Sequence, residues 1–278
     1  MLVKEKAINK MSSPRLIYIM GLPYSGTTLL NFIISSHSKC LGLGEASKVF
    51  HKRNHPNFQN RTCTCQSKYN DCLFWGDIES KICSTDLDES RFQKLFFEQA
   101  NKTHPTKVVV DSSKTYSHLK TMFESGVVSR EEVKIIFVQK DIRAWAHSFR
   151  RYRTWSTGST PSYYRAFLGW LLKIWFEKLR LQTLKLDYSV IKYEDLCQNK
   201  EEILTGVCRF LGLNFESEML SPQRSGAHFV TGNKMRRADE KCIEIKLDTK
   251  WQNDPNWRTP YAVYSFFNRL FNIFNALR

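Results

Sequence analysis

The sequence lacks any apolar run long enough to cross a membrane. Its longest run, residues 166–176, has 11 residues and is interrupted by Lys173, whereas a membrane-spanning helix needs about 20. Residues 1–14 carry three lysines and no apolar core, so we expect no secretory signal peptide. These two absences predict a soluble, cytoplasmic protein.

Acidic residues are scarce beside basic ones. The chain has 27 Asp and Glu against 42 Lys and Arg, a formal net charge of +15, and many basic residues lie between Lys140 and Lys185. Such a field usually serves an anionic partner, which is a nucleotide, an acidic lipid or sugar, or a nucleic acid. The charge alone is also consistent with a basic surface that is merely solvated.

Cysteines are few and lack the usual spacing of a zinc motif. Of the eight, only Cys63, Cys65 and Cys72 lie close together, with Cys83 further on. Paired ligands of structural zinc are separated by two to four residues, whereas one residue separates Cys63 from Cys65. The spacing favours free thiols or a local disulfide, and the missing signal peptide favours reduced thiols. We therefore predict no metal, although the sequence alone leaves these four cysteines free, disulfide-bonded or metal-bound.

A P-loop spacing is present without the P-loop lysine. Residues 15–20 are an almost uninterrupted apolar run, typical of a buried strand, and residues 27–34 have apolar positions at helical spacing. The turn 21–28 has the Gly-x4-Gly spacing of a P-loop, but Thr27 stands where the lysine is expected, and Thr28 takes the Ser/Thr position.

This turn is expected to hold an anion. A strand, a glycine-containing turn and a helix start bring free backbone N–H groups and the positive end of a helix dipole together, which suits a phosphate. A nucleoside triphosphatase needs the missing lysine on the β- and γ-phosphates. The loop therefore favours a phosphate cradle without metal-assisted phosphoryl transfer and disfavours a nucleotide kinase, while an ordinary βα turn is the simpler alternative.

Apolar runs alternate with helical periodicity, which predicts one α/β domain over residues 1–278 with a central parallel sheet flanked by helices. After the first strand and helix, we expect a short strand or extended turn at 38–46 and strands at 107–111, 134–140 and 188–193. Further helices are expected at 91–101, 142–152, 163–186, 200–212 and 261–278, and one more follows residues 112–114 and ends at 123.

Two stretches show little periodicity. Residues 47–84 are predicted to form an irregular insertion that shapes substrate access. Residues 155–162 are rich in Ser, Thr, Gly and Pro and are a candidate mobile lid. Ligands of open parallel sheets bind beyond the carboxyl ends of the strands, so we expect the turns 21–28, 112–114 and 140–148 to share one crevice.

Four segments, in this order, resemble the sulfotransferase superfamily, whose enzymes use 3′-phosphoadenosine 5′-phosphosulfate (PAPS). Residues 21–30 are similar to the loop for the 5′-phosphosulfate, and residues 140–148 to the strand–helix site for the 3′-phosphate. Residues 193–213 open with Tyr-Glu-Asp-Leu and end with Phe-Leu-Gly-Leu. Residues 228–236 read His-x3-Gly-Asn-x2-Arg, a pattern of the branch that includes carbohydrate and bacterial enzymes.

The resemblance implies a P-loop-like sulfotransferase fold and in-line transfer of a sulfuryl group from PAPS to an acceptor hydroxyl, without a metal. Residues 111–114 (Asp-Ser-Ser-Lys) and 63–75 (Cys-x-Cys to Cys-Leu-Phe-Trp) are also similar to that branch. The acceptor, which is a sugar, a lipid, a small molecule or a peptide tyrosine, is not readable from the sequence.

Position by position, the resemblance implies a cofactor site. The implied residues are Tyr24, Ser25, Gly26, Thr27, Thr28, Lys140, Ser148, Tyr193 and Arg236. Those between 24 and 28 belong to the 5′-phosphosulfate, Lys140 and Ser148 to the 3′-phosphate, and Tyr193 to the adenine. Lys140 stands where the family usually has Arg, so a bidentate fork becomes a point charge. Tyr24 stands where a cation often steadies the leaving phosphate, and Lys114 is assigned that role.

The catalytic base is assigned to Glu45. It lies 17 residues beyond Thr28, and its spacing from the phosphate loop is similar to that of the catalytic carboxylate of tyrosylprotein sulfotransferases. Sulfuryl transfer needs the acceptor proton removed as the new bond forms. Other sulfotransferases use a histidine, so His51, His55 and His118 are the alternatives.

The expected partner is the hydroxyl-bearing acceptor, and an anionic acceptor would suit the net charge. We expect no nucleic acid, although a nucleic-acid-binding protein is the competing class and predicts a steep salt dependence. The predicted helix 261–278 is basic with aromatics on one side, so it packs on the core or lies on an anionic membrane surface, and its periodicity favours the core. The oligomeric state is not readable.

Overall fold

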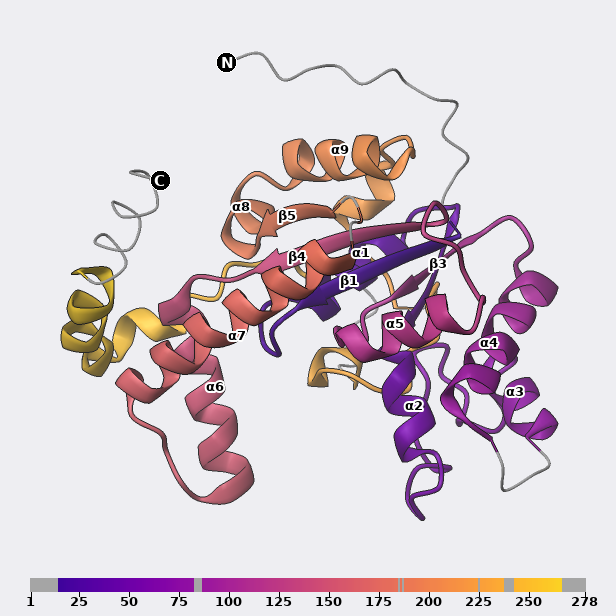
Figure 1. The fold of residues 1–278 in the computed structure, drawn as a ribbon, viewed down its shortest axis with the longest axis horizontal. Coiled ribbons are helices and arrows are strands. Elements are labelled where there is room, and N and C mark those ends of the chain that lie inside the picture. Colours follow the sequence, from indigo (N-terminus) through magenta and orange to yellow (C-terminus); the bar gives the residue numbers. More distant parts are fainter. Residues whose placement is uncertain are drawn as a thin grey trace.

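A five-stranded parallel sheet forms the centre of the molecule (Figure 1). The computed structural model describes residues 15–82, 87–184, 186, 188–224, 226–237 and 243–266. The strand order is β2-β3-β1-β4-β5. The strands are β1 (Leu16–Gly21), β2 (Cys40–Gly44), β3 (Val108–Asp111), β4 (Val133–Gln139) and β5 (Tyr188–Lys192).

Helices cover both faces of this sheet. They are α1 (Thr27–Ser35), α2 (Ala46–Lys52), α3 (Trp75–Lys81), α4 (Glu89–Thr103), α5 (Tyr116–Glu124), α6 (Ile142–Thr157), α7 (Tyr163–Leu184), α8 (Tyr193–Gln198) and α9 (Lys200–Leu211). Short 3-10 turns follow at Ser217–Leu220, Lys234–Arg237, Lys250–Asn253 and Pro255–Trp257. Figure 1 shows α8 and α9 on one side of the sheet and α5 and α7 on the other.

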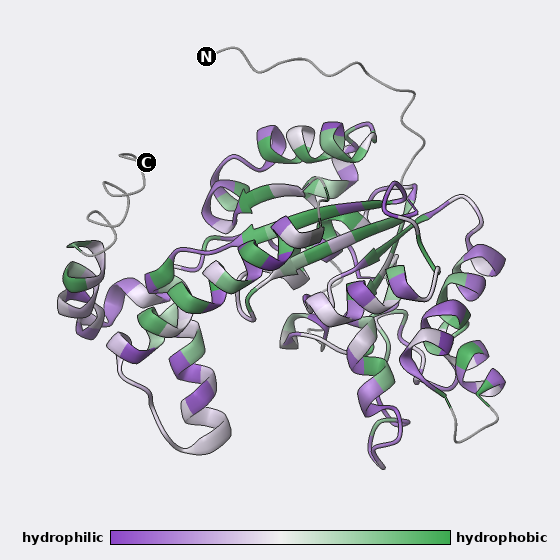
Figure 2. Cartoon of the chain, viewed as in Figure 1, coloured by the Kyte–Doolittle hydropathy of each residue, from purple (hydrophilic) through white to green (hydrophobic). Residues whose placement is uncertain are grey.

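Strand β1 separates the two cores because successive side chains of a strand point to opposite faces. Leu16, Tyr18 and Met20 pack with helices α2 to α7, whereas Ile17 and Ile19 pack with α1, α8 and α9. All five are fully buried, as expected for a strand covered on both sides. Figure 2 shows the central strands as the hydrophobic part of the chain.

Most predicted elements are confirmed, with ends shifted by a few residues, but the insertion 47–84 is more regular than predicted. It contains most of α2 and all of α3. Val49 of α2 and Trp75 and Ile78 of α3 are buried in the core. Helices of two turns bury too few residues to give a clear period, so the prediction of an irregular segment was wrong there.

The predicted loop 155–162 is also corrected, because α6 continues to Thr157 and ends at Gly158, whose φ of 68° is left-handed. The hydroxyls of Thr154 and Thr157 donate to the carbonyls of Arg150 and Arg153, at 2.9 Å in both cases. Hydroxyl side chains in a helix make this bond to the carbonyl four residues back. The loop is therefore only residues 158–162.

The predicted helix 261–278 and Cys83 lie partly or wholly outside the described residues. Residues 258–266 are helical, and the remainder of the predicted helix 261–278 lies outside the described part of the chain, as does Cys83. Within the described part, no helix has both the length and the apolar character needed to cross a membrane.

All five strands are parallel, so their carboxyl ends meet at one edge of the sheet. The chain leaves that edge through five turns, and each turn carries a residue that the sequence analysis assigned to the site. The residues are Thr28, Glu45, Lys114, Lys140 and Tyr193.

Candidate functional site

The loop between β1 and α1 presents an uncapped helix N-terminus. Gly26 is the N-cap residue with a left-handed φ of 95°, and no side chain caps the helix. A Cβ at Gly26 would lie 2.5 Å from the ring of Tyr193, so only glycine fits there. The first-turn N–H groups of α1 have no partner within the helix. The Ser25 Oγ atom is buried without a hydrogen-bond partner, and an anion would satisfy these donors.

Helix α6 fixes the outer part of this loop. The Trp145 indole N–H donates to the Pro23 carbonyl at 2.7 Å, a contact that no sequence pattern indicated. Tyr24 has a φ of 72°, and its ring lies 5.3 Å from that of Tyr152. Burial raises the pKa of the Tyr24 hydroxyl. Tyr24 therefore supplies no charge to the loop.

Glu45 and Lys114 meet beyond the ends of β2 and β3. The Lys114 Nζ and Glu45 Oε1 atoms are 2.6 Å apart, and both side chains are largely buried. Lys48, one helical turn further on, also contacts the carboxylate. Burial alone would raise the pKa of Glu45, but the two ammonium groups outweigh it and hold that pKa below its usual value. Burial lowers the pKa of Lys114 despite its carboxylate partner.

This carboxylate lies beside the phosphate loop. A Cβ at Gly232, which has a φ of +118°, would lie 3.7 Å from Glu45 Oε1 and 4.0 Å from Thr28 Oγ1. The neighbouring Thr231 hydroxyl donates to the Glu45 carbonyl at 2.8 Å. The segment that leads to Gly232 runs beside β2, where the His228 N–H donates to the Gly42 carbonyl at 2.8 Å, and it brings Gly232 next to both Glu45 and Thr28.

The turn after β3 positions Lys114. The Asp111 Oδ1 atom accepts from the Ser113 N–H at 2.7 Å and the Ser113 hydroxyl at 2.6 Å. The Ser112 N–H donates to the Gly44 carbonyl at 2.7 Å, which links this turn to the end of β2. Lys114 itself has a φ of 69°, uncommon for a residue with a side chain.

His118 does not face this site. Its Nε2 atom lies 3.1 Å from Asp111 Oδ2, and its Nδ1 atom contacts the carboxylate of Glu89. Burial would lower the pKa of His118, but the two carboxylates raise it to about 9. Both ring nitrogens are thus engaged. The other two histidine alternatives, His51 and His55, are exposed at and beyond the end of α2.

The two residues predicted to bind the 3′-phosphate lie at and after the end of β4. Lys140 Nζ is 3.0 Å from Asp248 Oδ2 and 4.8 Å from the centre of the Tyr193 ring. The Ser148 hydroxyl donates to the Ala144 carbonyl at 3.0 Å and lies 3.4 Å from the same Asp248 oxygen. Burial would raise the pKa of Asp248, but the Lys140 ammonium lowers it below its usual value. Asp248 was not among the predicted site residues, because it lies in a segment without periodic signal.

Arg236 lies beside the insertion. Its side chain is buried, and its guanidinium donates to the Thr62 carbonyl at 2.8 Å. Cys63, Cys65 and Cys72 carry free thiols and lie together with His228. The spacing of the three cysteines in the sequence gave no indication that His228 lies beside them.

Comparisons with known proteins agree with the arrangement of the sheet and the loop. A sequence model described as "Sulfotransferase family" matches residues 14–217. The solved sulfotransferase domain of an olefin synthase from Synechococcus PCC 7002 is similar, with a TM-score of 0.55 and 18% identity over 90% of this chain and 92% of that domain. The sulfotransferase domain from the curacin biosynthetic pathway has a TM-score of 0.53 and 20% identity over 84% of each chain.

At these identities the two solved domains show a shared fold. A comparison with curated protein sequences finds no match.

Proposed function

This chain belongs to the sulfotransferase family, and on that premise we propose that it transfers a sulfuryl group from PAPS to an acceptor hydroxyl. One observation carries the choice of donor: the two anion positions share the ring of Tyr193. Gly26 of the phosphate loop packs against that ring, and the Lys140 ammonium lies over it at 4.8 Å. A nucleotide with phosphates on both the 5′ and 3′ sides of its ribose matches this pair.

The residues present fit such a donor. The buried Ser25 hydroxyl and the first-turn N–H groups of α1 would take the 5′-phosphosulfate. Lys140 and Ser148 already share one carboxylate oxygen of Asp248. A 3′-phosphate would displace this carboxylate, because it offers more oxygens and more charge to the same two donors. The Tyr193 ring would stay between the two sites.

The proposed reaction is an in-line displacement at sulfur. The acceptor oxygen forms a bond to sulfur, the bond from sulfur to the bridging phosphate oxygen breaks, and the acceptor proton passes to Glu45. Glu45 is ionised, because its pKa lies below its usual value, so it is ready to accept a proton. Lys114 would turn from Glu45 to the leaving phosphate. That movement would remove the larger of the two ammonium effects that lower the pKa of Glu45, leave that of Lys48, and make Glu45 a stronger base.

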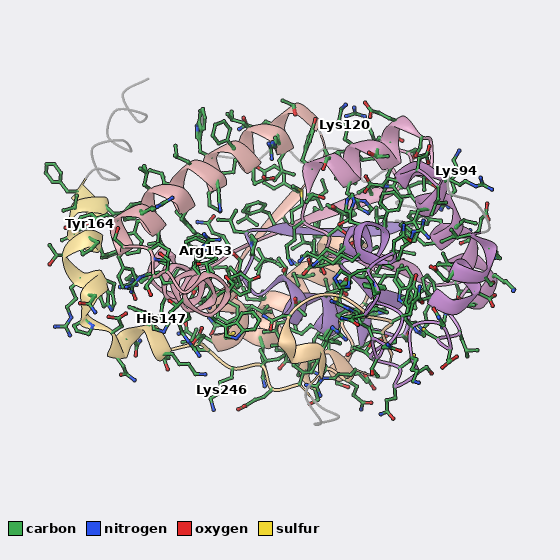
Figure 3. The ribbon with its side chains drawn as sticks, turned by 90° about the horizontal axis from the view of Figure 1, so that it is seen from below. Lys94, Lys120, His147, Arg153, Tyr164 and Lys246 are labelled. Carbon is green, nitrogen blue, oxygen red and sulfur yellow. The ribbon has the colours of Figure 1, made fainter. Side chains whose placement is uncertain are left out.

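Basic residues next to the phosphate loop favour an acceptor that carries negative charge. A hollow between α6 and α7 is lined by Phe149, Arg153, Ser159, Pro161 and Arg165. Figure 3 shows Arg153 on α6, and its charge lowers the pKa of the Tyr24 hydroxyl against the larger effect of burial. Its chain neighbour Tyr152 has its ring 5.3 Å from that of Tyr24, so Arg153 lies close to the loop. A sulfated or carboxylated acceptor is the proposed class.

Ligand-dependent thermal stability tests the donor. We expect adenosine 3′,5′-bisphosphate to stabilise the chain more than adenosine 5′-monophosphate, and more than ATP with Mg²⁺. A ligand at 100 times its dissociation constant adds about 2.7 kcal/mol to the free energy of unfolding. Transfer of radioactive sulfate from labelled PAPS to hydroxyl compounds then tests the reaction. Equal stabilisation by the monophosphate, or preference for an oligonucleotide, would contradict the proposal.

A further inference from the structure

Four potential metal ligands gather at the base of the insertion. The Sγ atoms of Cys63, Cys65 and Cys72 and a ring nitrogen of His228 all lie within 4.8 Å of one another. Cys63 and Cys72 are buried, and Cys65 and His228 are half-buried. In the described part of the chain no other such group of Cys, His, Asp and Glu occurs.

Four of the six distances between these atoms are close to those of a tetrahedral metal site. The Sγ of Cys72 lies 3.6 Å from that of Cys65 and 3.7 Å from that of Cys63. The His228 Nδ1 atom lies 3.2 Å from the Cys72 sulfur and 3.9 Å from the Cys63 sulfur. Bonds of about 2.3 Å to sulfur and 2.0 Å to nitrogen at tetrahedral angles give S···S and S···N separations of about 3.8 and 3.5 Å. A disulfide would bring two sulfurs to about 2.05 Å.

The backbone holds the cysteine turn in a ligating shape. The Cys63 N–H donates to the Ser67 carbonyl at 2.8 Å, and the Gln66 N–H donates to the Cys63 carbonyl at 2.9 Å. Gln66 takes a left-handed φ of 73°. This tight turn lets Cys63 and Cys65 point to the same place although only one residue separates them. The spacing rule from known zinc motifs does not anticipate such a turn.

Contacts other than those with the cysteine sulfurs fix the position of His228. The Trp75 indole N–H donates to the His228 carbonyl at 2.6 Å, and the Phe74 ring stacks on the imidazole at 5.5 Å. Thr64, between the two cysteines, bonds to the residues on both sides of His228: its hydroxyl donates to Ala227, and its N–H donates to Phe229. These contacts hold the backbone and the ring plane of His228 in place.

We propose that Cys63, Cys65, Cys72 and His228 bind one Zn²⁺ ion as a closed Cys3His structural site. Three thiolates and one imidazole are ligand types that zinc prefers, and four of them complete a tetrahedral coordination shell. No coordination position is then left for water or substrate. The ion joins the insertion to the segment that ends at Thr231, three residues after His228. Because Thr231 bonds to the Glu45 backbone, the metal supports the wall of the site without contacting substrate. Binding of the ion does not depend on the proposed reaction.

Metal content of the purified full-length chain is the direct test. The protein is expressed with zinc in the medium, desalted and analysed by plasma mass spectrometry. We expect about one zinc per chain, and Cys65→Ala should lose most of it because one of four ligands is gone. The matched control is Cys197→Ala, another half-buried free thiol, which should keep its zinc. Less than about half an equivalent in the parent, or a full equivalent in Cys65→Ala, would overturn the proposal.

Two measurements on the unaltered chain test the site without relying on a variant that folds. Replacement of zinc by Co²⁺ should give the thiolate-to-cobalt charge-transfer bands and intense visible bands of a tetrahedral site. Modification of the thiols with a mercurial should release the metal in step with three thiols per ion. Octahedral cobalt bands, or iron as the bound metal, would reject the zinc assignment.

Discussion

At Glu45, one buried carboxylate lies between two ammonium groups. A base with this environment is charged but weak, because Lys114 and Lys48 stabilise its ionised form. Its basicity is therefore tied to where Lys114 points. A shift of the Lys114 ammonium from Glu45 to the leaving phosphate would couple donor binding to activation of the base.

Replacing Glu45 tests this role. Glu45→Gln keeps the shape and hydrogen bonding of the side chain but cannot take a proton, so turnover should fall by roughly 10²–10⁴ while nucleotide affinity hardly changes. Sulfate transfer and calorimetry on the same preparation measure the two quantities. Glu244→Gln, at a carboxylate that is largely exposed, is the control. Turnover within a few-fold of the parent would move the role to His51 or His55.

Ser148 carries a prediction about the 3′-phosphate. Ser148→Ala removes one hydrogen bond to a charged group, worth about 1.5–3 kcal/mol, so the affinity for adenosine 3′,5′-bisphosphate should fall about 10- to 100-fold. The affinity for adenosine 5′-monophosphate should be unchanged. Isothermal titration measures both. Equal losses for the two nucleotides would remove Ser148 from the 3′-phosphate site.

Replacing Asp248 should have the opposite effect on the affinity for adenosine 3′,5′-bisphosphate. Its carboxylate is held by Lys140 and Ser148 and repels a second anion there. Asp248→Asn should therefore strengthen binding of adenosine 3′,5′-bisphosphate several-fold, because the side chain no longer competes for the Lys140 ammonium. The same titration tests it, and weaker binding would mean that Asp248 supports the site rather than occupying it.

At the scale of elements, the His118 network joins α4, β3 and α5. Glu89 begins α4, Asp111 ends β3 and His118 lies in the first turn of α5, and the charged imidazole bridges the two carboxylates. Asp111 also holds the turn that carries Lys114. The packing of α4 and α5 thus supports the geometry of the site.

This network predicts a pH dependence of stability. The folded pKa of His118 is raised to about 9 from the ordinary 6.5, so its stabilisation is complete below pH 6.5 and is lost as the pH rises through about 9. A rise of this size corresponds to roughly 3 kcal/mol. The difference in unfolding free energy between the parent and His118→Gln should therefore shrink over this range in urea titrations. The exposed His55→Gln is the control, and a difference independent of pH would contradict the assignment.

For the whole molecule, the charge balance predicts how salt acts on the acceptor. A net charge of +15 draws anions toward the chain, and the attraction is screened over about 10 Å at 0.1 M salt. The KM for an anionic acceptor should rise several-fold between low and physiological salt, while that for a neutral acceptor stays nearly constant. Steady-state kinetics with two such acceptors measures this, and Arg153→Gln should reduce the salt effect. A neutral acceptor with the stronger salt dependence would contradict the proposal of an anionic acceptor.

The sequence by itself determined what depends on neighbouring residues. The strand, glycine turn and helix at 15–35 form one short stretch, so apolar periodicity and the Gly-x4-Gly spacing were enough to predict β1, the phosphate loop and α1. The same holds for β3 and β4, whose buried stretches are almost continuous apolar runs, whereas β5 lies at the edge of the sheet and is only partly buried. Because parallel strands end at one edge, the order of elements also brought Glu45, Lys114 and Lys140 to one region.

Only the tertiary structure decided which side chains share a site across distant parts of the chain. Lys140 and Asp248 are 108 residues apart, and Cys63 and His228 are 165 apart. Such pairs depend on the path of irregular segments, which have no repeating pattern to predict from. A cysteine spacing that argues against zinc within one loop becomes a four-ligand cluster once the fold returns a histidine to it. The path of the backbone, set by packing against the sheet, decides that chemistry.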